Sequence, residues 1–390
     1  METKLVHAGE RREPPIGQPV ATPLYATATY TYDSMAQMDQ VFSGEGGDYV
    51  YSRYGNPTVG ALEEALATIE AGKVSIAYGS GMAAIHAALF ACELAPGSTV
   101  LASQDLYGAS FDLLKNIFGS YGVKTKTADF NNLEALKTNV EETKPRTLLA
   151  ETISNPLLKV CDIEKVAEIA HANGARLIVD NTFASPYLCQ PLNLGADFSV
   201  HSATKYLSGH ADAMGGIVVS REEFDRAALV GVLKLVGGVL SVWEAHQILR
   251  GVKTLGLRME KQCSNARILA ENLIKNERVE KVYYPHSAED EETTRKVLRA
   301  DFGGALVSIK LKDDTRDAAW CFMDNLKLCV RATSLGDVYT LVSHSASSSH
   351  RELSPKKRVE LGIAESLVRI SVGIEDVNDI IADVERALEK

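Results

Sequence analysis

Lys205 is the side chain of this sequence with the most distinctive chemistry for its position. It lies in a polar loop directly after a short apolar run, Phe198–Val200, that is typical of a buried strand. A lysine amine there can form a Schiff base with an aldehyde cofactor, and the hydroxyls of Ser202 and Thr204 can bind a phosphate group of that cofactor. A surface lysine is the simpler interpretation, and it is the better one if the loop is considered alone.

Two further polar residues follow predicted strands. Asp180 ends the apolar run Arg176–Val179, so its carboxylate lies at the end of a buried strand and needs a polar partner. The protonated nitrogen of a pyridine ring is a suitable partner, and the pairing keeps such a cofactor electron-withdrawing. Asn155, shortly after the run Thr147–Glu151, can hydrogen-bond an oxygen on the same ring. For Asp180, a helix cap or a turn is the simpler alternative.

Two turns between a predicted strand and a predicted helix complete this group. In the Gly79–Gly81 turn, followed by Met82, backbone N–H groups and the positive end of the helix dipole point toward one place, which suits a phosphate. Tight turns also require glycine for its backbone freedom, so this turn alone does not identify a site. Tyr107, in the second turn, can stack on a flat cofactor ring or can be an ordinary core residue.

The elements that carry these residues alternate along the chain. Seven short runs have the composition of strands: Lys73–Tyr78, Thr99–Ala102, Val123–Ala128, Thr147–Glu151, Arg176–Val179, Phe198–Val200 and Gly216–Ser220. Amphipathic helical patterns separate many of them: Leu62–Glu70, Met82–Leu94, Phe111–Tyr121, Leu133–Val140 and Ile163–Asn173. This alternation predicts βαβ crossovers and an α/β fold with a mostly parallel sheet. Ligands of such sheets bind at the carboxyl ends of the strands.

Two changes of pattern divide the chain into three parts. Residues 1–59 show no sustained period and predict an irregular arm, residues 60–250 predict the large α/β domain, and residues 251–390 predict a smaller α+β domain. The helical stretches Trp243–Gly251 and Leu255–Lys275 lead into this last part. Its predicted strands and final helix are Val279–Tyr283, Ala305–Leu311, Leu367–Val372 and Glu375–Leu388.

The composition argues against several classes of function. Of the 390 residues, 45% are hydrophobic and 24% are charged, and the formal net charge of −10 argues against a nucleic-acid surface. No apolar run of about 18 residues predicts a membrane span, and the N-terminal stretch Met1–Arg12 lacks the apolar run of a signal peptide. The six cysteines are far apart and form no CxxC pair, which favours a reduced cytoplasmic protein without a metal site.

Four stretches are more specific than the rest of the sequence. They are Tyr51–Thr58, Val179–Thr182, His201–His210 and Leu367–Glu375. Together with the order of the polar residues above, they resemble the pyridoxal 5′-phosphate (PLP) enzymes of cysteine and methionine metabolism, the trans-sulfuration enzymes, over essentially the full chain. This family includes γ-lyases, γ-synthases and O-acylhomoserine sulfhydrylases. The resemblance implies fold type I of the PLP-dependent transferases, a large, mostly parallel domain with a smaller α+β C-terminal domain.

The resemblance also implies roles for matching residues. Lys205 is expected to carry the cofactor and act as the base, Asp180 to pair with the ring nitrogen, and Tyr107 to stack on the ring and move protons. The other expected cofactor contacts are Gly81, Met82, Asn155, Ser202 and Thr204, with Tyr51 and Arg53 reaching the phosphate of a neighbouring subunit. Shared sites of this kind imply at least a dimer, and the resemblance implies a homotetramer, a dimer of dimers.

For the substrate, the resemblance implies a carboxylate site around Arg369. A planar guanidinium binds a carboxylate in a bidentate way, and Ser334, Asn155 and Thr333 are the expected neighbours. Thr333 differs from the glutamate typical of cystathionine enzymes and from the small apolar residue of methionine γ-lyases. The turn Leu106–Phe111 resembles the methionine γ-lyases more closely, although Ala109 replaces their cysteine.

The expected activity is γ-elimination from a sulfur-containing amino acid, as in a methionine γ-lyase or a cystathionine γ-lyase. Lys205 would remove the α-proton and carry protons between the α- and β-carbons, and the products would be a 2-oxo acid, ammonia and a thiol. The alternative is γ-replacement, as in an O-acetyl- or O-succinylhomoserine sulfhydrylase or a cystathionine γ-synthase. A PLP-binding protein without turnover is a further alternative, which the intact set of catalytic residues disfavours.

Overall fold

The computed structural model describes residues 17–44, 47, 49–286, 291–299 and 302–390. The stretch Met1–Arg12, in which the sequence shows no signal-peptide pattern, lies outside the described residues. Within these ranges, no helix is both long enough and apolar enough to cross a membrane.

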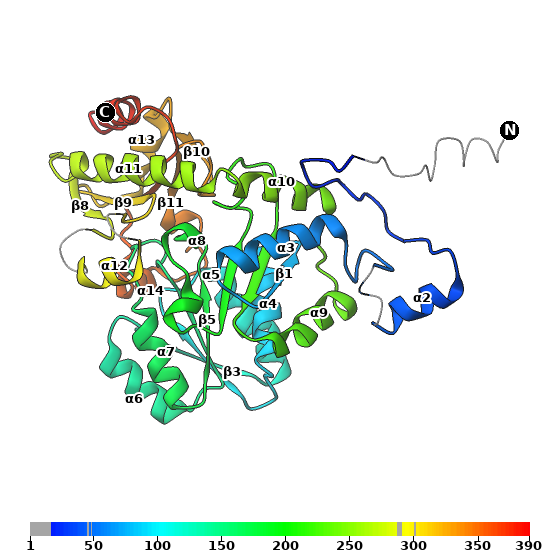
Figure 1. Ribbon diagram of the computed structural model, residues 1–390. Coiled ribbons are helices and arrows are strands. Elements are labelled where there is room, and N and C mark those ends of the chain that lie inside the picture. The colour runs from blue at the N-terminus through cyan, green and yellow to red at the C-terminus, as the bar shows by residue number, and fades with distance from the viewer. Residues whose placement is uncertain (1–16, 45–46, 48, 287–290, 300–301) are drawn as a thin grey trace.

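A seven-stranded sheet forms the centre of the larger part of the molecule (Figure 1). Its strands are β1 (Val74–Tyr78), β2 (Thr99–Ser103), β3 (Lys124–Ala128), β4 (Thr147–Glu151), β5 (Arg176–Asp180), β6 (Phe198–Ser202) and β7 (Gly216–Ser220). The order is β1-β7-β6-β5-β4-β2-β3, and only β7 runs antiparallel to its neighbours. The predicted α/β fold with a mostly parallel sheet is therefore confirmed. The carboxyl ends of β1, β2, β4, β5 and β6 share one edge.

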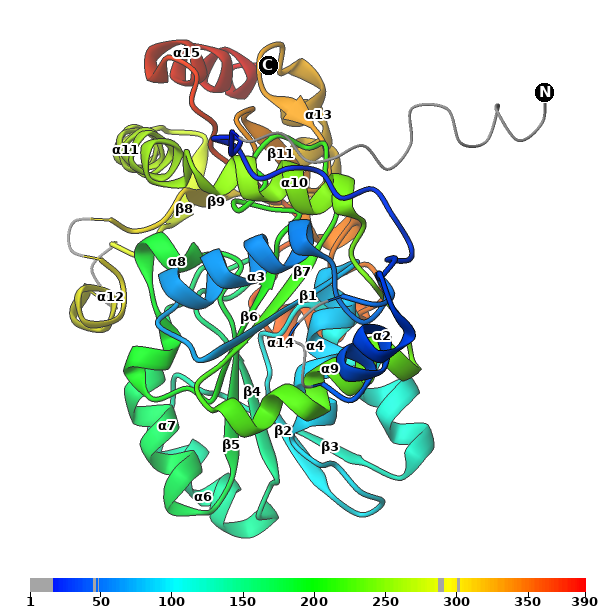
Figure 2. The ribbon, with the colours of Figure 1, turned by 45° about the vertical axis from the view of Figure 1, so that its right-hand side comes forward.

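Helices cover both faces of this sheet, so that the sheet is the middle one of three layers (Figure 2). One core joins the sheet to α3 (Pro57–Ile69), α6 (Leu133–Thr143), α7 (Ile163–Ala172) and α10 (Val242–Val252). The core on the other face contains α4 (Gly81–Ala91) and α9 (Arg226–Leu235). Successive strand residues face opposite sides, so Leu148 and Leu149 of β4 belong to different cores. The strands other than β3 are thus mainly buried on both sides, whereas the edge strand β3 has the sequence Lys-Thr-Lys-Thr-Ala and is mostly exposed.

A second sheet lies at one end of the molecule in both views (Figures 1 and 2). Its strands are β8 (Val279–Tyr283), β9 (Leu306–Leu311), β10 (Val330–Arg331), β11 (Leu341–His344) and β12 (Leu367–Ser371). The order is β10-β11-β12-β9-β8, antiparallel except for the β10–β11 pair. The helices α11 (Leu255–Leu273), α13 (Arg316–Asn325) and α15 (Val377–Leu388) share its apolar core. Three shorter helices are α8 (Ser185–Leu188), α12 (Glu291–Val297) and α14 (Pro355–Glu360).

The N-terminal segment is more regular than its sequence predicted. It contains α2 (Met35–Phe42), whose first turn is capped by the Ser34 hydroxyl. The helix predicted from Leu62 begins instead at Pro57, because Asn56 caps it through a 2.9 Å hydrogen bond from the backbone N–H of Thr58. Proline is favoured in a first helical turn, since its missing N–H has no intrahelical partner there. The domain boundaries at residues 59 and 250 stay predictions.

The predicted helix Phe111–Tyr121 is also different in the structure. A short helix, α5 (Gly108–Asp112), continues into a π-helical turn over Leu113–Phe118 and a 3₁₀ turn over Gly119–Tyr121. The segment ends at Gly122, whose φ of 82° is the left-handed conformation that glycine adopts readily at helix ends. Changes of helical type of this kind are frequent near functional sites.

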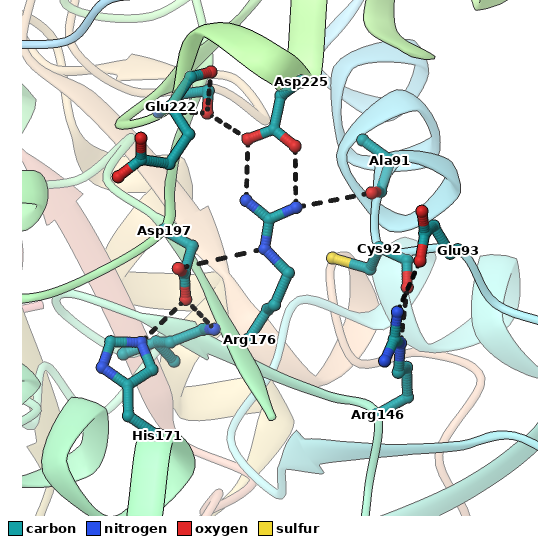
Figure 3. A network of polar contacts seen from close by, with 11 residues as sticks. Ala91, Cys92, Glu93, Arg146, His171, Arg176, Asp197, Glu222 and Asp225 are labelled. Carbon is teal, nitrogen blue, oxygen red and sulfur yellow. Dashed lines mark hydrogen bonds and ion pairs between the residues drawn. The ribbon is translucent and has the colours of Figure 1, made fainter. Parts of the chain in front are cut away.

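A polar network anchors the amino end of β5 (Figure 3). Arg176 donates from Nη1 and Nη2 to the two carboxylate oxygens of Asp225, at 2.8 and 2.7 Å. Its guanidinium also lies 4.3 Å from the ring centre of Phe198. Asp197 accepts from the backbone N–H of Leu177 at 2.8 Å and lies 3.9 Å from Nε of Arg176. Because Asp225 is only 2% exposed, each partner of this ion pair depends on the other.

We expect Arg176→Ala to lower the free energy of unfolding by about 3–5 kcal/mol, since it leaves the Asp225 carboxylate buried without its partner. Denaturant unfolding of the cofactor-loaded protein measures this. Arg226→Ala is the matched control, because the pair of Arg226 with Glu223 is exposed and is worth about 0–1 kcal/mol. Equal losses of stability in the two variants would contradict the prediction.

Candidate functional site

A cavity of about 660 Å³ is lined by the carboxyl ends of β4, β5 and β6 and by residues of the second sheet. It brings together all but two of the residues that the sequence singled out. Those that line it are Gly81, Met82, Tyr107, Asn155, Asp180, Ser202, Thr204, Lys205, Thr333, Ser334 and Arg369. Its size is in the usual range for small-molecule sites, about 300–1,000 Å³.

One side of the cavity is built to receive an anion. The helix α4 begins at Gly81, and the backbone N–H groups of Gly81 and Met82 donate no hydrogen bond within the described residues. A Cβ atom at Gly81 would lie 2.9 Å from Cβ of Ser202, so only glycine allows this close approach of the helix to β6. The hydroxyl of Thr204 accepts from the N–H of Gly215 at 3.1 Å. Free amides at a helix N-terminus, with hydroxyls beside them, suit a phosphate.

Asp180 offers a carboxylate oxygen at the end of β5. Its Oδ1 accepts from the backbone N–H and the hydroxyl of Thr182, at 3.0 and 2.5 Å, which orients the group. Burial raises the pKa of Asp180, while the two bonds from Thr182 and the charge of His201 oppose this shift. A cation placed beside Oδ2 would stabilise the ionised form. A protonated pyridine nitrogen is such a cation.

Glu151 is a residue of this site that the sequence interpretation missed. It ends β4 in register with Asp180 on β5, and its Oε1 accepts from the backbone N–H of Tyr107 at 2.7 Å. Burial, and then the neighbouring Asp180, raise the pKa of Glu151 well above its ordinary value. Glu151 thus fixes the turn that presents the Tyr107 ring to the cavity. An acidic residue ending an apolar strand, the pattern recognised for Asp180, was the available signal.

Lys205 extends its amine into the cavity. Its Nζ donates to the hydroxyl of Ser334 at 2.9 Å, and its backbone N–H donates to the carbonyl of Ser202 at 3.1 Å. Burial lowers the pKa of Lys205, and the charge of Arg369 lowers it further, while Asp337 opposes these effects. A lowered pKa increases the fraction of neutral amine, which is the form that attacks an aldehyde or removes a proton.

Arg369 reaches the cavity because of the alternation along β12. Val368 and Ile370 face the apolar core of the second sheet, so Arg369 between them faces the opposite side. Its Nη1 donates to Oδ1 of Asn155 at 2.8 Å, and its Nη2 donates to the carbonyl of Ser334 at 3.0 Å. It is 7% exposed, burial lowers its pKa to about 10, and it has no ion pair with a carboxylate of the described residues. A buried, unpaired guanidinium is suited to a substrate carboxylate.

We expect Arg369→Ala to raise KM for amino-acid substrates about ten- to a hundredfold, the equivalent of one charged hydrogen-bonded contact. A smaller change is expected in kcat, because the carboxylate is bound before and during the reaction alike. Arg369→Lys, which keeps the charge but loses the planar fork, should give an intermediate KM. Steady-state kinetics with several amino acids measures this, and an unchanged KM for Arg369→Ala would remove the role from this residue.

Tyr51 and Arg53 do not line the cavity. Tyr51 is 40% exposed, and the guanidinium of Arg53 lies 5.4 Å from its ring centre and 4.9 Å from that of Tyr54. Arg53 also donates to the backbone carbonyl of Lys234. Their side chains therefore lie on the surface of this chain, away from its own cavity.

The groups that line the cavity match the phosphate, the ring nitrogen and the aldehyde of pyridoxal 5′-phosphate. The free amides of Gly81 and Met82 fit its phosphate, Oδ2 of Asp180 fits its ring nitrogen, and the amine of Lys205 fits its aldehyde. Across the described ranges, no group of three or more His, Cys, Asp or Glu side chains is arranged to hold a metal ion. Fold and site together define a PLP-binding α/β protein.

Comparisons with known proteins identify the family. The model of the Cys/Met metabolism PLP-dependent enzymes matches residues 2–389, and the chain belongs to that family. It is 43% identical to an L-methionine gamma-lyase of Fusobacterium nucleatum, over 100% of this chain and 98% of that protein. The predicted family, its enzymatic nature and its cofactor, pyridoxal 5′-phosphate, are confirmed.

Solved structures agree with this assignment. A cystathionine gamma synthase from Xanthomonas oryzae pv. oryzae, in complex with aminoacrylate and cysteine, matches with a TM-score of 0.88 and 34% identity, covering 95% of this chain and 93% of that one. A putative O-acetylhomoserine (thiol)-lyase from Campylobacter jejuni, with a pyridoxyl-lysine at its position 205, matches with a TM-score of 0.90 and 29% identity, covering 95% and 96%.

Proposed function

We propose that this enzyme catalyses γ-elimination on a sulfur-containing amino acid and releases a 2-oxo acid, ammonia and a thiol. The observation that carries the proposal is the position of the Lys205 amine, which contacts Ser334 in a cavity that also holds the unpaired Arg369. A substrate carboxylate bound to Arg369 lies beside the base that must reach its α- and β-carbons. The 43% identity to an L-methionine gamma-lyase over the full chain supports lyase chemistry.

Different residues of the chain have different roles in the proposed reaction. When bound, PLP supplies an electron sink for the α-carbon, held by Asp180 at its ring nitrogen and by Gly81 and Met82 at its phosphate. Arg369 orients the substrate through its carboxylate. Lys205, whose pKa burial lowers, takes the α-proton and delivers protons along the carbon chain. Tyr107, fixed through Glu151, is placed to protonate the leaving sulfur.

The second candidate is γ-replacement on an O-acylated homoserine, in which a thiol adds where the acyl group left. Thr333 lines the cavity with a hydroxyl, which resembles neither the acidic nor the small apolar residue expected in the two lyase types. The similar structures include a cystathionine gamma synthase and a putative O-acetylhomoserine (thiol)-lyase, which favour this alternative. Both reactions use the same residues up to loss of the γ-substituent.

Release of 2-oxobutyrate by the PLP-loaded protein tests the proposal. The substrates are methionine, cystathionine, homocysteine and O-acetylhomoserine, each with and without added thiol. We expect strong release of 2-oxobutyrate from a thioether in the absence of added thiol. The thioether that reacts then identifies the leaving group. Product that forms only from O-acetylhomoserine and added thiol would replace the proposal by the second candidate.

We further propose that two subunits share each active site, as part of a homotetramer that works in the cytoplasm. The surface position of Tyr51 and Arg53, away from their own cavity, supports a role in the cavity of a neighbouring chain. The six cysteines are free thiols, which suits a reducing compartment.

Mixing experiments test the shared site. Arg53→Ala and Lys205→Ala chains are each expected to be nearly inactive as homo-oligomers. When the two chains pair at random, about half of the pairs contain one chain of each variant. One of the two sites in such a pair has both Arg53 and Lys205 intact, so we expect up to about a quarter of the wild-type activity to return. Native mass spectrometry verifies the mixing, and no recovery in verified mixed oligomers would contradict sharing.

A further inference from the structure

One wall of the cavity carries a cation that the proposed function does not use. Arg351 lines the same cavity as Lys205, and its side chain is exposed. It forms no ion pair with a carboxylate in the part of the chain that the structure describes. By contrast, Arg316 and Arg358 both pair with Glu365, at 3.0 and 2.7 Å. The charge of Arg351 is therefore available to a ligand.

The loop that presents Arg351 is fixed against the active-site turn. The backbone N–H of Arg351 donates to the carbonyl of Ser348 at 3.2 Å, and the Ser348 hydroxyl donates to the carbonyl of His344 at 2.7 Å. A Cβ atom at Gly108 would lie 3.1 Å from the carbonyl oxygen of Ser349, so the loop packs closely on the turn after Tyr107. These contacts hold the turn that carries Arg351 against the turn that carries Tyr107, and both side chains line the cavity.

The chemistry of this wall is polar throughout. The segment from position 343 to 351 contributes four serines and one arginine to the cavity lining: Ser343, Ser347, Ser348, Ser349 and Arg351. Hydroxyls and a guanidinium offer hydrogen-bond donors to an anion. They offer little apolar surface to the methyl end of a simple thioether. The cavity carboxylates, Glu151 and Asp180, lie instead on the ends of β4 and β5.

We propose that Arg351 and Ser347–Ser349 form a subsite for a second carboxylate, carried by the substrate beyond its γ-carbon. This inference rests on the proposed function and deepens it: Arg369 holds the α-carboxylate, and Arg351 holds the distal one. The substrate class is then amino acids whose leaving group itself bears a carboxylate, either thioethers or esters of homoserine.

Binding of analogues that lack a leaving group tests the subsite without turnover. L-Norleucine, L-2-aminoadipate and L-2-aminopimelate have the same α-carbon groups, and only the last two have a distal carboxylate. Calorimetry on the PLP-loaded enzyme gives their dissociation constants. We expect one of the two diacids to bind at least about fivefold more tightly than norleucine, the scale of one accessible ion pair. Arg351→Ala should bring this ratio to about one, and Arg351→Lys should retain part of it.

The control variant is Lys356→Ala, which removes an exposed cation from the same segment without altering the cavity lining. It should keep the wild-type preference for the diacid. Equal affinities in the wild-type enzyme, or a preference that persists in Arg351→Ala, would overturn the subsite. So would a selective loss of PLP affinity in Arg351→Ala, which would assign the arginine to the cofactor phosphate. A diacid preference in an enzyme that releases no 2-oxo acid would keep the subsite and reject the proposed function.

Discussion

Replacing Lys205 by alanine is expected to lower kcat about 10⁴-fold, the upper end of the effect of a general base, because the same amine also attaches the cofactor. The protein should still fold and hold PLP without a covalent link, since the proposed phosphate and ring sites, at Gly81 and Asp180, do not involve this side chain. Single-turnover kinetics measures the loss of activity. Borohydride reduction followed by peptide mass spectrometry measures the loss of attachment.

Lys205→Arg is the matched control for charge. It retains a cation near Ser334, but a guanidinium does not form the covalent link or act as a base at neutral pH. We therefore expect Lys205→Arg to be as inactive as Lys205→Ala. Substantial activity in either variant, or reductive attachment of PLP to another lysine of the wild-type enzyme, would refute the assignment of Lys205.

Replacing Asp180 by alanine is expected to weaken PLP binding about ten- to a hundredfold and to lower kcat about 10²–10³-fold. In the proposed site this carboxylate would hold the proton on the ring nitrogen, so its loss should reduce both the attraction to the cofactor and the electron demand at the α-carbon. Equilibrium dialysis of PLP and saturating-substrate kinetics measure the two effects separately.

Asp180→Asn separates charge from shape. Its amide oxygen can still accept the hydrogen bonds of Thr182, so the end of β5 should keep its geometry. We expect kcat to fall nearly as far as in Asp180→Ala, while PLP binding is weakened less. If Asp180→Asn kept the kcat of the wild-type enzyme, the ring nitrogen would not depend on this carboxylate.

The cofactor half of the site was predictable because its signals are local. Asp180 is the last residue of the apolar strand β5, Lys205 lies shortly after the end of β6, and Gly81 opens a helix shortly after β1. In a mostly parallel sheet the carboxyl ends of the strands meet at one edge, so local order along the chain determines proximity in space. Glu151 carried the same local signal, and its role became visible only through its 2.7 Å bond to the Tyr107 backbone.

The substrate half depends on contacts between distant segments. Arg369 bonds Asn155, 214 positions earlier in the chain, and Lys205 bonds Ser334, 129 positions later. Family resemblance named these residues, but no local pattern places them in one cavity. The short strands β10 and β11 were missed for the same reason, because each is held by pairing and not by a period of its own.

The sequence by itself predicted the fold class, because strand periodicity and polar residues at strand ends are properties of short segments. Its resemblance to a known family predicted the cofactor and the residues expected to hold it. Only the tertiary structure decided that Arg351 and three serines face the cavity, and that Tyr51 and Arg53 do not line it. The physical reason is that the position of Arg351 follows from how the second sheet and its loops pack on the first, and that of Tyr51 and Arg53 from how the N-terminal segment lies on the large domain. That packing depends on many distant side chains at once.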